Sequence, residues 1–244
     1  MHDPGAVTAD ELFAGALAGQ ENEDDAPVPF LVALHRRPTR EVFDRAARLL
    51  SCAEPVQRRL GVLVLRELGP QDQDGRRPFT TETVRLLRRA MRDEPDPQVL
   101  RWTISTFGYH CAHETLDTVL GYAGHEDWPV RFGVAAALPS VADPDRTEER
   151  VVDALLRLSG DDDEDVRWYA LYALFNETSG VPDERKRAWA AALAADADAE
   201  RCAELRHIGT TLDEDADQVL RQLLLSAGGA DGAGGTGGAA GATG

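Results

Sequence analysis

A motif that returns about every 36 residues is the feature that most constrains how this chain can fold. In its clearest copies an acidic residue precedes a Val-Arg pair, which opens an Ala/Leu-rich stretch. The valines that anchor the four copies are Val56, Val99, Val130 and Val166, so the successive steps are 43, 31 and 36 residues. Such a period is typical of stacked helix pairs, because one pair alone cannot bury its apolar face. We therefore predict an all-α solenoid, a right-handed α-α superhelix of about five to six helix pairs, over residues 28–226.

Three copies place an aspartate three residues before the valine, at Asp96, Asp127 and Asp163. An aspartate at this N-cap accepts a hydrogen bond from an otherwise free amide and favours the positive end of the helix dipole. In the two clearest copies an arginine follows the valine, at Arg131 and Arg167. We expect these five residues to form a structural Asp/Arg ladder between neighbouring repeats.

The composition of the two ends differs from that of the solenoid. Residues 1–27 contain seven acidic residues and no Lys or Arg, which predicts an acidic, partly disordered arm. Within it, Thr8 and Glu11 have the spacing of a capping box and predict one short helix. Residues 227–244 are mainly Gly and Ala, with too little to bury, and predict a disordered tail.

Two features of the first repeats stand out within the solenoid. The apolar faces of residues 30–34 and 42–50 predict a first, atypical helix pair. A long loop, Gly69 to Thr81, follows the copy at Val56 and is expected to project from one end of its helix pair.

The net charge of −17 is unevenly distributed. Residues 36–101 contain 15 Arg and 10 acidic residues, whereas residues 102–226 contain 11 basic and 25 acidic residues. An acidic protein is disfavoured as a nonspecific ligand of nucleic acid. We predict that the Arg-rich segment 36–101 faces either the protein's own acidic arm or a partner other than the one bound elsewhere on the solenoid.

Several classes of protein are disfavoured by the sequence. No run of 18 apolar residues is present, so no membrane span is expected, and the N-terminus lacks the pattern of a secretory signal. The three cysteines are widely spaced and odd in number, which favours a cytoplasmic location. No P-loop, G-x-S-x-G or dinucleotide motif occurs, so neither catalysis nor a cofactor is predicted. His110, Cys111 and His113 lack the paired spacing of a zinc site, and no metal is expected.

The D-x-x-V-R-x-x-A-x-x-A-L pattern of residues 127–138 and 163–174 resembles the HEAT repeat, in its short bacterial, phycobilin-lyase-type form. The resemblance covers about residues 28–226, and it departs from the pattern where Gln57 and Leu100 replace the arginine after the valine. It implies a fold and a stacking rule. It implies no ligand, because such arrays include scaffolds, DNA glycosylases, pigment lyases and hydroxylases.

In similar arrays, the residues two, three and six positions after the valine point into the concave face. Transferred to this chain, that rule selects a set of aromatic residues for partner binding: Trp102, Phe132, Trp168, Tyr169 and Tyr172. Exposed aromatic residues on a concave wall are common anchors of protein interfaces. The alternative is that they pack between repeats, as large side chains often do.

The predicted function is a non-enzymatic interaction or scaffold module that binds a protein or peptide on its concave face. The first alternative is a HEAT-like DNA glycosylase or another nucleic-acid-binding protein. That class needs a positively charged groove, whereas acidic residues predominate around Trp168 and Tyr169. The second alternative, a bilin-lyase-like chaperone for a tetrapyrrole, depends on the repeat type alone.

Overall fold

The computed structural model describes residues 7–19, 29–73 and 75–229, and all regular structure within these ranges is helical. The acidic stretch 21–25 and the tail from residue 230 onward lie outside the described residues. The α-helices are α1 (Ala9–Gly19), α2 (Pro29–His35), α3 (Arg40–Leu49), α4 (Pro55–Arg66), α5 (Thr80–Ala90), α6 (Pro97–Tyr109), α7 (Leu116–Gly121), α8 (Trp128–Val141), α9 (Glu149–Leu158), α10 (Glu164–Tyr172), α11 (Asp183–Ala195), α12 (Ala199–Thr211) and α13 (Gln218–Leu225). A 3-10 turn, His113–Thr115, precedes α7, and a π-helical segment, Ala173–Glu177, continues α10.

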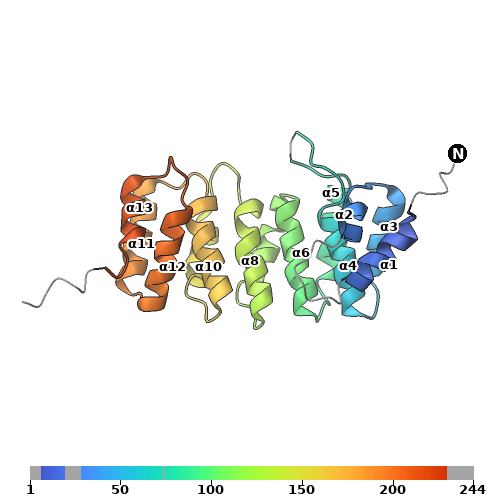
Figure 1. Ribbon diagram of the computed structural model, residues 1–244, viewed down its shortest axis with the longest axis horizontal. Helices are drawn as coiled ribbons and strands as arrows, with labels where there is room; N and C mark the ends of the chain where they lie inside the picture. Colours follow the sequence, from blue (N-terminus) through green and yellow to red (C-terminus); the bar gives the residue numbers. More distant parts are fainter. Residues whose placement is uncertain (1–6, 20–28, 74, 230–244) are drawn as a thin grey trace, which may run out of the picture.

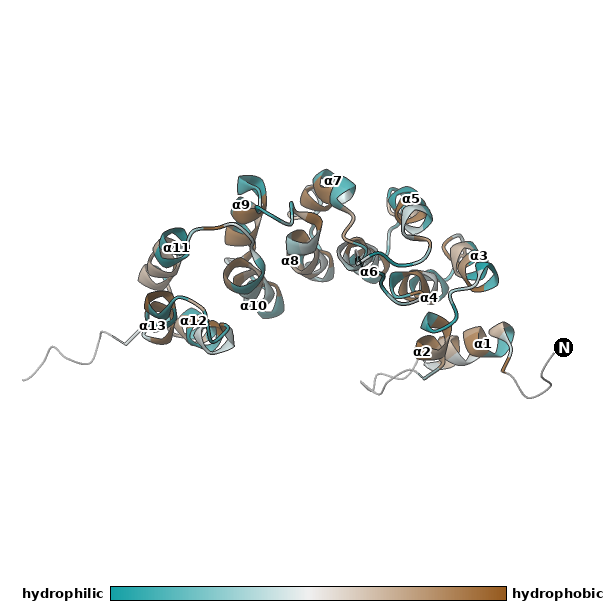
Figure 2. Ribbon diagram, turned by 90° about the horizontal axis from the view of Figure 1, so that it is seen from above, coloured by the Kyte–Doolittle hydropathy of each residue, from teal (hydrophilic) through white to brown (hydrophobic). Residues whose placement is uncertain are grey.

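The helices form two rows along a curved array (Figures 1 and 2). The inner, concave row consists of α4, α6, α8, α10 and α12, and the outer row consists of α3, α5, α7, α9 and α11. Neighbouring inner helices pack directly on each other, and α13 packs on α11 and α12 at the C-terminal end. The predicted all-α solenoid is therefore confirmed. Within the described part of the chain, no helix is long and apolar enough to cross a membrane.

The N-terminal end is built differently from the prediction. Helix α3 packs on α4, whereas α2 packs mainly on α1 and α4, so the predicted pairing of residues 30–34 with 42–50 is wrong. The reason lies in α1, whose Leu12, Phe13 and Ala16 are buried and supply the apolar face that α2 covers. The predicted capping box of this helix is present, since the Glu11 amide donates to Thr8 Oγ1 and the Thr8 amide donates to Glu11 Oε2.

The repeat motif places its valines in the core. Val99, Val130 and Val166 are each the third residue of an inner helix and are buried. In α4 the third residue is Gln57, and Val56 is only half-buried. The predicted register of this first copy is therefore shifted by one residue.

Two of the predicted N-caps make the expected hydrogen bonds. Asp96 accepts from the amides of Gln98 and Val99, at 3.0 and 2.9 Å, and Asp163 accepts from the amide of Val166 at 3.1 Å. Asp127 occupies the same position before α8 but makes no capping bond with its side chain, so the prediction is wrong for this residue.

The loop between α4 and α5 projects beyond the ends of the helices, as predicted (Figure 1). Its base is fixed by Gly69, whose φ of 84° is a left-handed conformation that favours glycine. A Cβ atom there would lie 2.8 Å from Pro38 and from Pro78. Arg77 Nη1 donates to the Gly69 carbonyl at 2.6 Å, and this bond holds the end of the loop against the inner row.

Candidate binding groove on the concave face

A hollow of about 560 Å³ opens on the inner face along α4, α6, α8 and α10; we call it the groove. Its walls come from these helices, the α4–α5 loop and the π-helical segment, and consist of Arg66, Gln71, Arg77, Arg101, Trp102, Ser105, Gly108, Tyr109, Cys111, Phe132, Gly133, Ala136, Ser140, Tyr169 and Glu177. The residues two, three and six positions after Val99 and Val130 all belong to this wall, where the sequence placed them.

The floor of the groove depends on a close approach of α6 and α8. A Cβ atom on Gly133 would lie 3.0 Å from the Arg101 carbonyl oxygen, and one on Gly108 would lie 3.3 Å from the Ala137 Cα. Contacts this short exclude a larger side chain unless the backbone moves. The two glycines therefore bring the side chains of neighbouring helices into one site.

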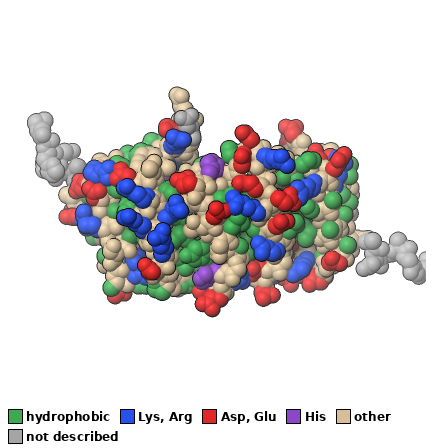
Figure 3. All heavy atoms as spheres, turned by 180° about the vertical axis from the view of Figure 1, so that it is seen from behind, with side chains coloured by type: hydrophobic (Ala, Val, Ile, Leu, Met, Phe, Trp, Pro, Cys, Tyr) green, Lys and Arg blue, Asp and Glu red, His purple; other side chains and the backbone are tan. Residues whose placement is uncertain are grey.

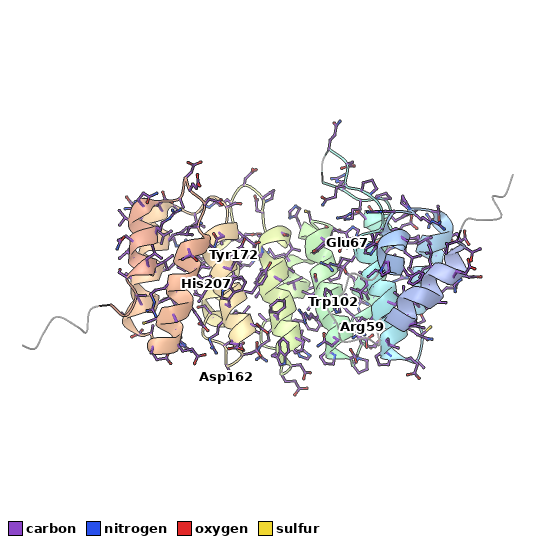
Figure 4. The ribbon with its side chains drawn as sticks, viewed as in Figure 1. Arg59, Glu67, Trp102, Asp162, Tyr172 and His207 are labelled. Atoms are coloured by element: carbon purple, nitrogen blue, oxygen red, sulfur yellow. The ribbon has the colours of Figure 1, made fainter. Side chains whose placement is uncertain are left out.

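Three of the five predicted aromatic residues, Trp102, Phe132 and Tyr169, line the groove, whereas Trp168 and Tyr172 are outside its lining and contact it through Tyr169. The rings of Phe132 and Tyr169 meet edge to face, with centroids 5.3 Å apart. Trp168 stacks on Tyr172, with centroids 5.4 Å apart and planes 12° apart, and also contacts the His207 ring of α12 (Figure 4). All five are half-buried and pack on the core, so each is only partly available to a partner.

Two arginines lie among these rings. The Arg66 guanidinium carbon is 3.7 Å from the Tyr109 ring centre and 5.1 Å from that of Trp102. The Arg101 guanidinium carbon is also 5.1 Å from the Trp102 ring centre and 4.5 Å from that of Phe132. A contact of this kind between a guanidinium and an aromatic ring is attractive when the cation is desolvated.

The other end of the groove contains a carboxylate. Burial raises the pKa of Glu177, and no described Lys, Arg or His forms an ion pair with it. Burial, with a contribution from the Glu177 charge, raises the pKa of the nearby Tyr169 to about 12. Glu177 is the last residue of the π-helical segment, and such segments occur frequently at functional sites.

The predicted ladder is present, but its carboxylates are not the predicted ones. Arg131 donates through Nε and Nη2 to Asp161, both at 2.7 Å, and Arg167 donates to Glu204 and Glu200. Each arginine also donates through Nη1 to the carbonyls five and six residues before it. Among the described residues no arginine pairs with the caps Asp96, Asp127 or Asp163, because an arginine in the first turn reaches the next repeat, at Asp161 in the loop before α10 or at Glu200 and Glu204 in α12.

Comparison with known proteins assigns the central repeats to a family. A family model described as HEAT repeats matches residues 84–175, which contain α6, α8 and α10. This segment consists of HEAT repeats. Among the curated proteins, none matches the chain.

Solved structures that are similar to this chain include two designed armadillo repeat proteins. The protein YibA of Escherichia coli is 13% identical over 92% of this chain and 98% of its own, with a TM-score of 0.46. The designed armadillo repeat protein YIII(Dq)4CqI is 14% identical over 89% and 98%, with a TM-score of 0.38. A second design, YIII(Dq.V1)4CPAF in complex with peptide (KR)4, is 15% identical over the same shares, with a TM-score of 0.37. At these identities and scores, the matches say nothing about the ligand.

Helices α4, α8 and α10 share one pattern of hydrogen bonds from an arginine in the first turn, and α6 interrupts this pattern. Arg58, the fourth residue of α4, donates to Glu94 at 2.7 Å and to the carbonyls of Cys52 and Ala53, as Arg131 and Arg167 do at the fourth positions of α8 and α10. The equivalence of Arg58 is hidden in the sequence, because the predicted anchor Val56 is one residue out of register.

The interruption lies between α6 and α8. The fourth residue of α6 is Leu100, which is buried, and the loop position that holds Glu94 or Asp161 in other repeats holds His125. His125 Nδ1 accepts from the Asp127 amide at 3.1 Å, as Glu94 and Asp161 accept from the amides two residues after them. The HEAT array therefore lacks one ion pair at the point where the groove is centred.

The histidines near the groove have structural partners. His110 is buried, and its ring nitrogens contact the Leu65 carbonyl at 3.1 Å and Thr80 Oγ1 at 2.8 Å. His113 Nδ1 lies 3.3 Å from the Val141 carbonyl. Within the described ranges no group of three or more His, Cys, Asp or Glu side chains could hold a metal ion.

The Arg-rich segment 36–101 divides between the two faces. On the outer face, basic side chains gather over the N-terminal half of the molecule (Figure 3). Helix α5 of the outer row carries three exposed arginines, Arg85, Arg88 and Arg89. Arg45 forms an ion pair with Asp10 of the N-terminal arm. Arg66, Arg77 and Arg101 of the same segment line the groove together with Trp102, Phe132 and Tyr169, and the predicted separate partner of the segment stays a prediction.

The groove residues that were not selected from the sequence include Arg66, Tyr109 and Glu177. Tyr109 lies seven residues after Trp102, and Arg66 lies seven residues after Arg59 on the inner helix α4. Residues seven apart lie on the same face of a helix, so the rule for concave positions, when continued for two more turns of the helix, includes both residues. Glu177 has no such signal, because a π-helical turn changes the spacing.

Proposed function

We propose that this protein is a non-enzymatic interaction module that holds a protein or peptide segment in the groove. In this proposal the main contacts are Trp102, Phe132, Trp168, Tyr169 and Tyr172. The observation that carries it is the set of five half-buried aromatic rings, three of which line a hollow of about 560 Å³ while Trp168 and Tyr172 contact one of these three. A few aromatic residues in such a position commonly supply most of the affinity of an interface.

The shape of the groove also favours an extended ligand. It runs across successive inner helices of the HEAT array, so a segment lying along it would contact several repeats in turn. We infer a cytoplasmic location from the three cysteines, since Cys52, Cys111 and Cys202 are all free thiols.

The test begins with a phage-displayed library of random dodecapeptides selected on the full-length protein. The selected peptides are synthesised with a fluorescent label and titrated by fluorescence anisotropy. We expect Tyr172→Ala to weaken their binding by about thirtyfold, the effect of losing an aromatic hot spot. Tyr172→Phe keeps the ring that stacks on Trp168 and serves as the matched control, for which near-normal affinity is expected.

A thermal melt of the same variants separates binding from packing. Truncation of a core aromatic residue costs about 3–5 kcal/mol of unfolding free energy. Unchanged affinity in Tyr172→Ala, or a loss of that size in its stability, would show that this side chain serves repeat packing and would remove the centre of the proposed site.

A further inference from the structure

The N-terminal end of the groove contains two cations, Arg66 and Arg101, that the described residues satisfy only in part. Arg101 contacts aromatic rings and makes no ion pair with any described carboxylate. Arg66 pairs only with its neighbour Glu67, at 3.4 Å, and its buried Nε has no hydrogen-bond partner among the described residues. The Arg66 side chain is nevertheless only 15% exposed.

This arrangement is costly for the folded protein alone. A guanidinium removed from water needs hydrogen-bond acceptors, and the arginines of the ladder have them. Burial lowers the pKa of Arg101, and the charge of Arg66 lowers it further, against the opposing effect of Asp165. Both guanidinium carbons lie 5.1 Å from the Trp102 ring centre, so an anion that contacts both would relieve both costs.

Aromatic rings lie against both guanidiniums. Tyr109 and Trp102 lie against Arg66, and Trp102 and Phe132 lie against Arg101. Neither guanidinium donates a hydrogen bond to a described residue, so N–H donors of both are left for a ligand. A planar carboxylate matches the donors of a guanidinium with two parallel hydrogen bonds.

Building on the proposed function, we propose that Arg66 and Arg101 bind a carboxylate side chain of the partner, which is an acidic peptide segment. In this segment an Asp or Glu stands next to an aromatic or aliphatic residue. The carboxylate lies between the two guanidiniums over Trp102, and the neighbouring apolar side chain packs against Phe132 and Tyr169.

A nucleic acid also combines anions with flat rings, but the rest of the groove opposes it. A bound strand needs cations along its backbone. Here Glu177 lines the same hollow and has no cationic partner among the described residues, and Asp165 lies near Arg101. The whole chain also carries a net charge of −17. A peptide with one or two acidic residues at one end satisfies the arginines without placing anions against Glu177.

The experiment uses the dodecapeptides selected on the full-length protein. The tightest binder is synthesised in two forms, one as selected and one with every Asp and Glu replaced by Asn and Gln. We expect the wild-type protein to bind the acidic form at least about tenfold more tightly, and the double variant Arg66→Gln/Arg101→Gln to bind both forms equally within about twofold.

Two further variants test the geometry. Arg88→Gln removes the same charge from the exposed outer face of α5, and it should keep the preference for the acidic form. Arg101→Lys keeps the charge but loses the fork of donors, so an intermediate preference is expected. Thermal melts of all variants, together with the affinity of the neutral peptide, show whether the groove is still folded.

The contrary outcomes are distinct. A preference for acidic peptides that survives in Arg66→Gln/Arg101→Gln, or selected peptides without acidic residues, overturns the assignment of these arginines. If those peptides still lose affinity in Tyr172→Ala, the proposed function stands. If no peptide is selected, both proposals are wrong. Tight binding of a fluorescein-labelled single-stranded deoxythymidine 20-mer that requires Arg66 and Arg101 would replace the peptide with a nucleic acid.

Discussion

Two sets of arginines on the same inner helices have opposite surroundings. Arg58 and Arg131 lie in the first turn of their helices, where each donates to a carboxylate of the following repeat and to two carbonyls. Arg66 and Arg101 face the groove, where aromatic rings lie against them and acceptors are scarce. The first set joins repeats to each other, and the second has donors left for a ligand.

The carboxylates divide in the same way. Burial alone would raise the pKa of Asp161, but hydrogen bonds from Arg131 and from the Asp163 amide outweigh it and hold the pKa below its usual value. Burial raises the pKa of Glu177, because no cation compensates for it. Incompletely satisfied groups of both signs therefore gather in the groove, as is common at functional sites.

The largest expected difference between the two sets is in stability. Arg131→Ala leaves Asp161, whose side chain is only 8% exposed, without its cation. We expect it to lower the free energy of unfolding by about 3 kcal/mol, because a buried charge is left unpaired. Arg101→Ala removes a cation that has no such partner, and its cost should stay within about 1 kcal/mol. Urea denaturation followed by tryptophan fluorescence measures both. Equal losses would contradict the division into ladder and groove arginines.

A smaller effect is expected from rebuilding the missing ion pair at Leu100 and His125. Leu100→Arg alone should destabilise the protein, since it places a cation at a position that is buried. Adding His125→Asp supplies the carboxylate that Glu94 and Asp161 supply in the other repeats. The double variant should therefore be more stable than the sum of the two single changes by about 1–2 kcal/mol.

Leu100→Gln combined with His125→Asp is the matched control for this cycle, because glutamine is polar but cannot form the ion pair. Additive effects in the Leu100→Arg cycle would mean that the loop before α8 does not present residue 125 to α6 as the other loops present Glu94 and Asp161.

The fold can be predicted from the sequence more completely than the candidate site can. Val99, Val130 and Val166 can be located by spacing alone, because every repeat must bury the same helix position. Arg58 was missed because Val56, one residue out of register, looks like an anchor although it is half-buried. A local motif does not show whether its valine is the second or the third residue of the helix.

The composition of the groove depends on contacts that the repeat motif does not contain. Trp102 and Phe132 follow the rule for concave positions, but Arg66 lies at the end of α4, two turns beyond it. Whether an arginine has a partner is decided by the next repeat, which is 30 to 37 residues away for Arg131 and Arg167. For this reason the charge of segment 36–101 did not predict which arginines are neutralised.

The smallest expected effect concerns Glu177 and depends on pH. Its pKa in the folded protein is raised by burial, so the folded state binds a proton more tightly than the unfolded state does. Below roughly pH 4 the Glu177 carboxyl is protonated in both the folded and the unfolded state, so its burial does not lower the free energy of unfolding through ionisation. As the pH rises through the folded pKa, the wild type loses stability that Glu177→Gln keeps. The variant should therefore melt at a slightly higher temperature than the wild type at pH 7 and at the same temperature at pH 4.

Glu214→Gln, at an exposed position between α12 and α13, is the control and should show no such divergence. A gap of equal size at both pH values would show that Glu177 is compensated in the folded protein, and the groove would then differ from the ladder only in its arginines.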